Sequence, residues 1–126
     1  LSHTILAQPP VDFSTALPYF NFVYTVIETP VYAGKVKRIL TDDERDAFAV
    51  FIAQKPMAGS VVRGSGGVRK VRWAQKGKGK SGGARVIYYN RLENGEIWLL
   101  TIYAKSDRST IPSRELKLIK EVIDRD

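Results

Sequence analysis

The sequence contains no cysteine and a single histidine, His3, among its 126 residues. Without cysteine, disulfide bonds and zinc sites built on thiolates are excluded. A histidine-based metal cluster or a Ser–His–Asp triad would have to use His3, and a residue so close to the N-terminal end is usually solvated. We therefore expect the function to need neither a metal ion nor another cofactor.

Long apolar runs are also missing from the chain. The longest strongly apolar run, residues 97–104, has the length of a strand, whereas a membrane-spanning helix needs roughly 18 apolar residues. No basic segment leads into an apolar stretch at the N-terminal end, as it does in a secretory signal. With 44% hydrophobic and 26% charged residues, the composition is typical of a globular protein. We expect a cytoplasmic location.

Acidic residues are scarce in one long segment. Residues 63–105 contain ten Lys or Arg and two Glu, while the whole chain has a net charge of +7. Because such a concentration of positive charge attracts polyanions, it favours a nucleic acid as the partner. The alternative is a basic surface that only keeps the protein in solution.

The first 21 residues differ from the rest of the chain. They hold three of the six prolines and almost no charge, and neither a helical nor a strand period emerges in them. We expect residues 1–21 to form an extension of unassigned role and residues 22–126 to form one domain.

Residues 22–56 predict a strand followed by two helices. β-branched and aromatic residues dominate 22–28, which is typical of a strand. Thr29-Pro30 has the residue types of an N-cap and a first helical position, and Thr41 and Glu44 have the spacing of a capping box. The positions expected to be buried on the two helices are Tyr32, Val36, Ile39 and Leu40, and then Ala47, Phe48, Phe51 and Ile52.

The rest of the chain predicts three strands and a last helix. The strands, at 68–74, 84–90 and 96–104, follow a glycine-rich loop at 57–67, and Asn94-Gly95 favours a tight hairpin. The order β-α-α-β-β-β-α, a strand meander with helices on one side, predicts an α+β fold with a small antiparallel sheet, an N-terminal helical hairpin and a C-terminal helix. The last helix is expected to start after Ser109 or Thr110 and to bury Leu116, Ile119, Val122 and Ile123.

Strand alternation predicts a cationic pocket. Because side chains alternate between the two faces of a strand, Lys70 and Arg72 share one face of their strand, and Tyr103 and Lys105 share one face of theirs. If the register brings Arg85 to the same side, a positively charged hollow with a phenol results. The alternative is a basic surface that faces solvent, or that binds a phosphate backbone without catalysis.

Such a pocket suits the cleavage of RNA by its own 2′-hydroxyl group. The reaction needs a base for the 2′-oxygen, cations for the phosphoryl oxygens and an acid for the leaving 5′-oxygen. The arginine fork bonds two phosphoryl oxygens at once, and a lysine crowded by other cations can act as a base. The acid is either another cation or the tyrosine. The candidate catalytic residues are Lys70, Arg72, Arg85, Tyr103 and Lys105.

The glycine- and lysine-rich run at 76–83 is predicted to bind RNA. It is not a P-loop, because Ala74 stands where that motif needs a glycine and because the run leads into a strand instead of a helix. A basic hairpin loop that grips the RNA backbone fits better, and the alternative is a solvated turn. Candidate contacts with RNA or the ribosome are Arg69, Trp73, Lys76, Lys78 and Lys80, where Trp73 is open to a stacking or a core role.

Four segments together, 64–72, 76–83, 85–89 and 99–105, resemble the HigB-like branch of the RelE/ParE superfamily, the toxins of type II toxin–antitoxin systems. The similarity covers about residues 22–124, and the first 21 residues lie outside it. The resemblance implies a RelE-like microbial RNase fold, with an antiparallel sheet, helices on one face and a C-terminal helix. It also implies cleavage of mRNA in the ribosomal A site, without a metal, that leaves a 2′,3′-cyclic phosphate.

The resemblance further implies partners and residue roles. A cognate antitoxin, expected to be a helix-turn-helix protein, would neutralise the toxin, and the complex would bind operator DNA through the antitoxin. By position, the basic pair on the first meander strand of the family matches Lys70 and Arg72. The basic residue that opens the next strand matches Arg85, and the one that ends the last strand matches Lys105.

The sequence also departs from the family pattern. Some relatives place an Arg after the last strand and a Tyr at the start of the last helix, where this chain has Ser106 and the neighbours of Pro112. Tyr103 is therefore the candidate for the proton transfer of that Tyr. Two alternatives remain: a ParE-like inhibitor of DNA gyrase, whose relatives generally lack such a cationic cluster, and a non-catalytic module that binds RNA or antitoxin.

Overall fold

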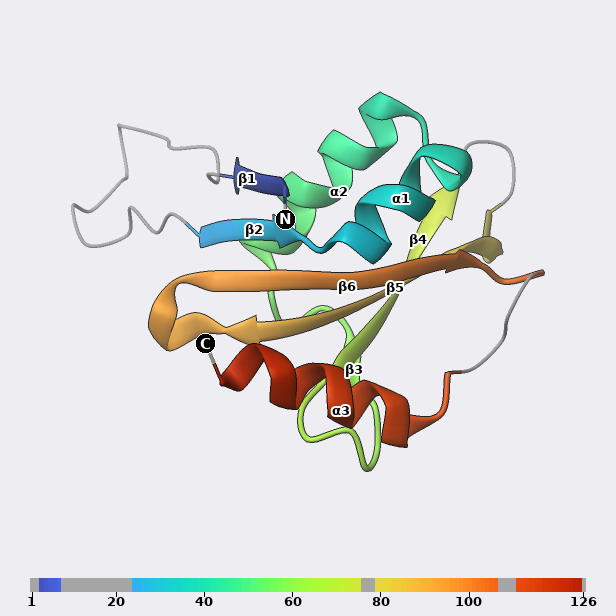
Figure 1. The fold of residues 1–126 in the computed structure, drawn as a ribbon. Coiled ribbons are helices and arrows are strands. Elements are labelled where there is room, and N and C mark those ends of the chain that lie inside the picture. Colours follow the sequence, from blue (N-terminus) through green and yellow to red (C-terminus); the bar gives the residue numbers. More distant parts are fainter. Residues whose placement is uncertain (1–2, 8–23, 76–78, 107–110, 126) are drawn as a thin grey trace.

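The computed structural model describes residues 3–7, 24–75, 79–106 and 111–125 of the chain. In this part of the chain, three α-helices pack against a six-stranded sheet (Figure 1). The helices are α1 (Pro30–Ile39), α2 (Asp42–Gln54) and α3 (Ser113–Asp124), and a 3-10 turn, η2 (Leu92–Asn94), joins the last two strands. The strands are β1 (His3–Ala7), β2 (Tyr24–Glu28), β3 (Ser60–Val61), β4 (Arg69–Gln75), β5 (Gly79–Arg91) and β6 (Glu96–Ala104).

The strand order in the sheet is β1-β2-β6-β5-β4-β3. All neighbouring strands are antiparallel except β2 and β6, which pair in parallel from Thr25↔Glu96 to Glu28↔Leu99. The predicted α+β fold is confirmed, and its sheet is mixed instead of wholly antiparallel. Hairpins fix the antiparallel pairs locally, whereas β2 and β6 are far apart in the sequence and no local pattern records their relative direction.

Helices α1 and α2 form the predicted helical hairpin. The hydroxyl of Thr29 accepts a hydrogen bond from the Tyr32 N–H at the start of α1, where Pro30 is the first helical residue. Thr41 and Glu44 form the reciprocal capping box of α2. The hairpin buries Tyr32, Val36, Leu40, Phe48 and Ile52 as expected, whereas Ala47 is exposed and Ala49 and Ala53 are buried in its place.

Helix α3 packs on the face of the sheet opposite to α1 and α2 (Figure 1). The expectation of helices on one side of the sheet was therefore wrong. Both faces of the sheet carry apolar side chains, so both are covered by helices. On β5, Val86 packs in the core under α1 and α2, and its neighbour Ile87 packs in the core under α3. From α3, Leu116 and Ile123 complete this second core.

The start and the apolar stripe of α3 differ from the prediction. Its N-cap is Pro112, which makes no side-chain capping bond, and the expected caps Ser109 and Thr110 lie outside the residues described. Two of the four expected core positions, Leu116 and Ile123, are buried. The other two, Ile119 and Val122, are 39% and 57% exposed and lie at the surface.

Both edges of the sheet carry strands that the sequence did not predict. His3–Ala7 pairs antiparallel with Glu28–Tyr24, so the N-terminal segment, where no period emerged, adds β1 beside β2. At the other edge, β3 lies inside the predicted loop and pairs with Arg69 and Lys70. With only two residues, β3 is too short to show a pattern of its own, and β1 forms by pairing with β2. Across the described ranges, none of the helices combines the length and apolar character that crossing a membrane requires.

A buried ion pair ties β2 to α2. Glu28 is completely buried, and the Nε of Arg45 donates to its carboxylate at 2.8 Å while the Nη2 of Arg45 bonds to the second oxygen. The hydrogen bond to Glu28 raises the pKa of Arg45. Burial, reinforced by the charge on Glu28, raises the pKa of Tyr32 on α1 far above its usual range. The pair therefore fixes the helical hairpin to the sheet.

Candidate functional site

Arg72, Arg85 and Tyr103 lie side by side on three adjacent strands. Arg72 of β4 pairs with Arg85 of β5, which pairs with Tyr103 of β6. Directly paired residues project to the same face of a sheet, with Cα atoms about 4.5–5.5 Å apart. The two guanidinium groups and the phenol therefore start from one row, which we call the catalytic row for the role that we propose for it. It lies on the face covered by α3, because Tyr103 belongs to the core under that helix.

Lys70 and Lys105 flank the catalytic row. Lys70 is two residues before Arg72 on β4, which places it on the same face about 7 Å along the strand. Lys105 follows β6, and its N–H donates to the Gly83 carbonyl at 3.3 Å, so the ladder continues past the strand and alternation places Lys105 on the face of Tyr103. The register thus brings all five candidates to one face, as strand alternation required.

These five residues differ in burial, both within the row and beside it. Arg85 and Tyr103 are only 9% and 5% exposed, Lys70 is half-buried, and Arg72 and Lys105 are exposed. The Nη1 of Arg85 donates to the Gly83 carbonyl at 3.3 Å, which orients the guanidinium. An anion that binds between Arg72 and Arg85 would lose contact with bulk water on one side. The local dielectric constant is lower there, so the attraction between the anion and the arginines would be stronger than in water.

No acidic residue occupies a paired position in the rows of Lys70 and Arg72. Both rows are described from edge to edge, and their members are Ser60, Lys70, Ile87 and Thr101, and then Arg72, Arg85 and Tyr103. Within the described ranges, no three His, Asp or Glu side chains are grouped closely enough to hold a metal ion.

Arg69 and Trp73 lie on the opposite face of β4 by alternation, and Trp73 packs there under α2. The Trp73 ring packs against Phe48 and Phe51, with ring centroids 5.3 and 5.0 Å apart. The Nη1 of Arg69 donates to the Gly59 carbonyl at 2.6 Å. Both side chains are half-buried, and neither joins the catalytic row.

The lysines of the glycine-rich run are only partly covered by the structure. Lys76 and Lys78 lie outside the described residues, and Lys80 is described by its backbone alone, on β5. Strand β5 extends to Gly79, five residues before the predicted start at Ala84. The run therefore connects β4 to β5 at the end of the sheet that also carries Arg72 and Arg85.

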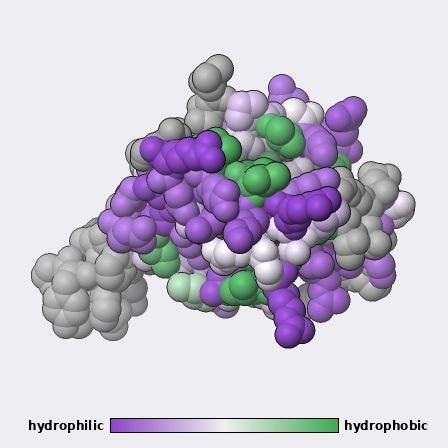
Figure 2. Space-filling model, turned by 60° about the horizontal axis from the view of Figure 1, so that its bottom comes forward, coloured by the Kyte–Doolittle hydropathy of each residue, from purple (hydrophilic) through white to green (hydrophobic). Residues whose placement is uncertain are grey.

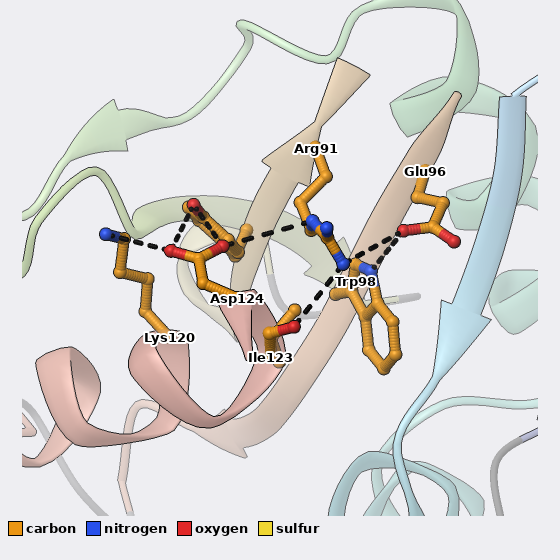
Figure 3. Close-up of polar contacts among 7 residues, drawn as sticks. Arg91, Glu96, Trp98, Lys120, Ile123 and Asp124 are labelled. Carbon is orange, nitrogen blue, oxygen red and sulfur yellow. Dashed lines mark hydrogen bonds and ion pairs between the residues drawn. The ribbon is translucent and has the colours of Figure 1, made fainter. Parts of the chain in front are cut away.

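Sequence reasoning missed a polar network that anchors the C-terminal end of α3 (Figure 3). The hydroxyl of Tyr89 donates to the Asp124 carboxylate at 3.0 Å, and Lys120 bonds to the same group at 2.9 Å. Arg91 lies 3.9 Å from Asp124 and donates to the Ile123 carbonyl at 3.3 Å. The Lys120–Asp124 spacing of four residues was the available signal, but it did not show which strand α3 meets.

Asp124→Asn is expected to loosen α3 slightly at neutral pH. The hydrogen bond from Lys120, helped by that from Tyr89, lowers the pKa of Asp124. A lowered folded-state pKa adds stability above the unfolded-state value and loses it as the pH falls through the folded-state value. The loss in the variant should be small, because the pair is exposed and screened.

Urea denaturation at pH 7 and at pH 3 measures this prediction. The two proteins should differ at pH 7, and the difference should shrink at pH 3, because the contribution of Asp124 fades as the pH falls below its unfolded-state pKa toward its lowered folded-state pKa. Glu121→Gln, on the same helix, is the matched control and should behave as the wild type at both values. A difference in unfolding free energy between the wild type and Asp124→Asn that grows as the pH falls would contradict the stabilising role of the Asp124 carboxylate.

A family model described as the RelE toxin of the RelE / RelB toxin–antitoxin system matches residues 39–125 of this chain. The matched range begins at the end of α1 and includes the catalytic row, both flanking lysines and α3. Strands β1 and β2 and nearly all of α1 lie before it.

Proposed function

Because this chain belongs to the RelE toxin family of RelE/RelB toxin–antitoxin systems, we propose that it is a ribosome-dependent endoribonuclease that cleaves mRNA and so inhibits translation. The observation that carries the proposal is the catalytic row, in which two arginines and a tyrosine pair across three strands beside Lys70. The reaction is a transesterification by the 2′-hydroxyl of the RNA, and in this proposal it uses no metal.

Each residue of the cationic face has a place in this reaction. Arg72 and Arg85 bond the non-bridging oxygens of the scissile phosphate and stabilise their charge in the transition state. Lys70, half-buried beside them, takes the proton of the 2′-hydroxyl. The bond from the 2′-oxygen to phosphorus forms as the bond to the 5′-oxygen breaks, which leaves a 2′,3′-cyclic phosphate. Tyr103, with Lys105 next to it, supplies the proton to the 5′-oxygen.

The remaining candidates are proposed to bind RNA away from the reacting phosphate. Lys76, Lys78 and Lys80 lie in or beside the connection from β4 to β5, and their charge suits the RNA backbone. Arg69 and Trp73 project from the other face, so a contact between them and ribosomal RNA is separate from the cleavage site.

The same proposal extends to branch, location and partners. The four motif segments favour the HigB-like branch of the family. The antitoxin that the family implies is proposed to be a helix-turn-helix protein that carries the complex to operator DNA. A toxin that acts on translating ribosomes works in the cytoplasm.

The direct test is the incubation of purified toxin with ribosomes programmed with an mRNA. We expect fragments with 2′,3′-cyclic phosphate and 5′-hydroxyl ends, formed with EDTA-treated toxin as with untreated toxin, and no cleavage of free mRNA. Relaxed or cleaved DNA in a gyrase assay, with intact mRNA on the ribosome, would instead favour the ParE-like activity. A toxin that binds ribosomes without cleaving would be a non-catalytic module.

A further inference from the structure

Thr29 bonds to the carbonyls of Leu99 and Leu100 on the outer edge of β6, and beyond Leu100 no described strand covers this edge, which α1 and α3 flank. Strand β2 pairs with β6 only from Glu96 to Leu99, and no strand in the described part of the chain pairs there with the rest of β6, up to Ala104. Figure 1 shows β6 in the foreground with α1 on one side and α3 on the other. Because the Lys105 N–H bonds toward β5, alternation directs the peptide groups of Ile102 and Ala104 toward the open edge.

An apolar groove with a volume of about 270 Å³ begins where β2 leaves β6. Leu100 and Leu116 line its base, and its walls are Val31 of α1 and Ile119 of α3, which are 55% and 39% exposed. Val122, one turn after Ile119 on α3, is 57% exposed. Figure 2 brings the α3 side forward and shows hydrophobic residues at the surface between hydrophilic ones. Val31 and Ile119 form one apolar surface with the groove between them, and a contiguous apolar surface of this kind can mark a site of interaction.

One buried polar group in this groove lacks a hydrogen-bond partner. Thr101 lines it and is only 6% exposed, and its hydroxyl makes no hydrogen bond in the described structure. A buried hydroxyl without a partner is unfavourable, and such groups are rare in folded proteins. Lys35 of α1 and Glu115 of α3 also line the groove, which therefore carries one charged residue of each sign.

We propose that the antitoxin lays an extended segment along the open edge of β6, in the groove between α1 and α3. A strand in this place would pair its backbone with Ile102 and Ala104, and its side chains would point alternately toward Val31 and toward Ile119. It would carry apolar residues in the groove and one hydrogen-bonding group for Thr101. A helix leaves the edge of β6 unpaired, and a small ligand leaves Val122 uncovered.

The inference rests on the antitoxin that the family implies and is independent of the nuclease proposal. Its site also neighbours the catalytic row, because Thr101 is two residues before Tyr103 on the same strand and pairs with Ile87. An antitoxin strand bound there would contact β6 next to the residues proposed to cleave RNA. Cleavage and antitoxin binding are therefore measured separately on every variant.

Val31→Asp and Ile119→Asp are each expected to weaken antitoxin binding by roughly tenfold or more, since each places a charge where an apolar contact forms. Calorimetric titration with the purified cognate antitoxin measures this. Val50→Asp, at a 41% exposed position on α2, is the matched control and should bind as the wild type. All three variants should keep wild-type melting temperature and cleavage. Val31, the more exposed of the two, remains informative if the Ile119 variant folds poorly.

Thr101→Val is expected to affect the stability of the free toxin and its affinity for the antitoxin in opposite directions. The free toxin should melt at a higher temperature, because its unpaired hydroxyl is gone, while antitoxin binding should weaken about fivefold, the loss of one hydrogen bond. In the complex, hydrogen exchange should slow at the amides of Ile102 and Ala104. Unchanged binding by both Asp variants, or slowed exchange at β1 instead of β6, would overturn the proposal. A free toxin that dimerises, and that Val31→Asp turns into a monomer, would make a second copy the occupant and overturn it as well.

Discussion

Arg72→Ala is expected to lower the rate of mRNA cleavage on the ribosome by about 10²- to 10³-fold, the usual cost of removing one group that stabilises developing charge. Arg72 is exposed, so its removal should leave the fold intact. Primer extension on programmed ribosomes measures the rate, and thermal denaturation checks the fold. Arg38→Ala removes an equally exposed arginine from α1 and should cleave at the wild-type rate. Equal rates for the Arg72 variant and the wild type would remove Arg72 from the site.

A conservative change at Arg85 tests the same role for the second arginine of the catalytic row. Arg85 is nearly buried and bonded to the Gly83 carbonyl, so alanine there would also disturb packing. Arg85→Lys keeps the charge but loses the fork that bonds two oxygens, and it should lose most of the activity. Expression of the wild type should arrest translation in cells, and both variants should relieve the arrest. Arrest that persists in both would sink the role of the catalytic row.

Arg45→Ala should destabilise the protein by about 3–5 kcal/mol, the cost of breaking a buried ion pair by removing one partner. Glu28 is completely buried, and Arg45 donates a hydrogen bond to each of its two carboxylate oxygens. Without Arg45, a carboxylate would remain in the core between β2 and α2 with no compensating charge. Urea denaturation measures the loss as a lower midpoint at an unchanged slope.

A second substitution distinguishes a lost charge pair from lost packing. Glu28→Gln combined with Arg45→Ala removes the buried charge, so the double variant should recover a large part of the loss. Arg38→Ala, at an exposed position of α1, should change the stability by less than about 0.5 kcal/mol. A double variant as unstable as Arg45→Ala alone would show that packing, not charge, is lost at this site.

Local patterns in the sequence predicted most of the helices and strands. The capping box of Thr41 and Glu44 and the Pro at the start of α1 are decided by neighbours three or four residues apart, so they can be read before the fold is known. The prediction failed for the start of α3, where Pro112 occupies the N-cap without a side-chain bond. It also failed for β1 and β3, which depend on a partner strand and not on their own residues.

The candidate site was predicted only in part, because local patterns describe single strands and not how the strands pair. Alternation along one strand placed Lys70 with Arg72 and separated both from Trp73. Whether Arg85 joined them depended on the register between strands, which the tertiary structure sets as Arg72↔Arg85↔Tyr103. Because a slip by one residue turns every side chain of a strand to the other face, the sequence alone could only state the condition.

The sequence by itself determined which chemical groups the protein carries: a basic segment rich in Arg and Lys, and no thiolate. It also determined which side chains alternate along each strand. The tertiary structure decided which face those cations share, that β2 and β6 run in parallel, and that α3 covers the face opposite to α1 and α2. The physical reason is the distance along the sequence over which each kind of interaction acts. Capping and alternation arise between near neighbours, whereas register, strand direction and helix placement arise from contacts between distant segments, each of which has to be satisfied by the whole core at once.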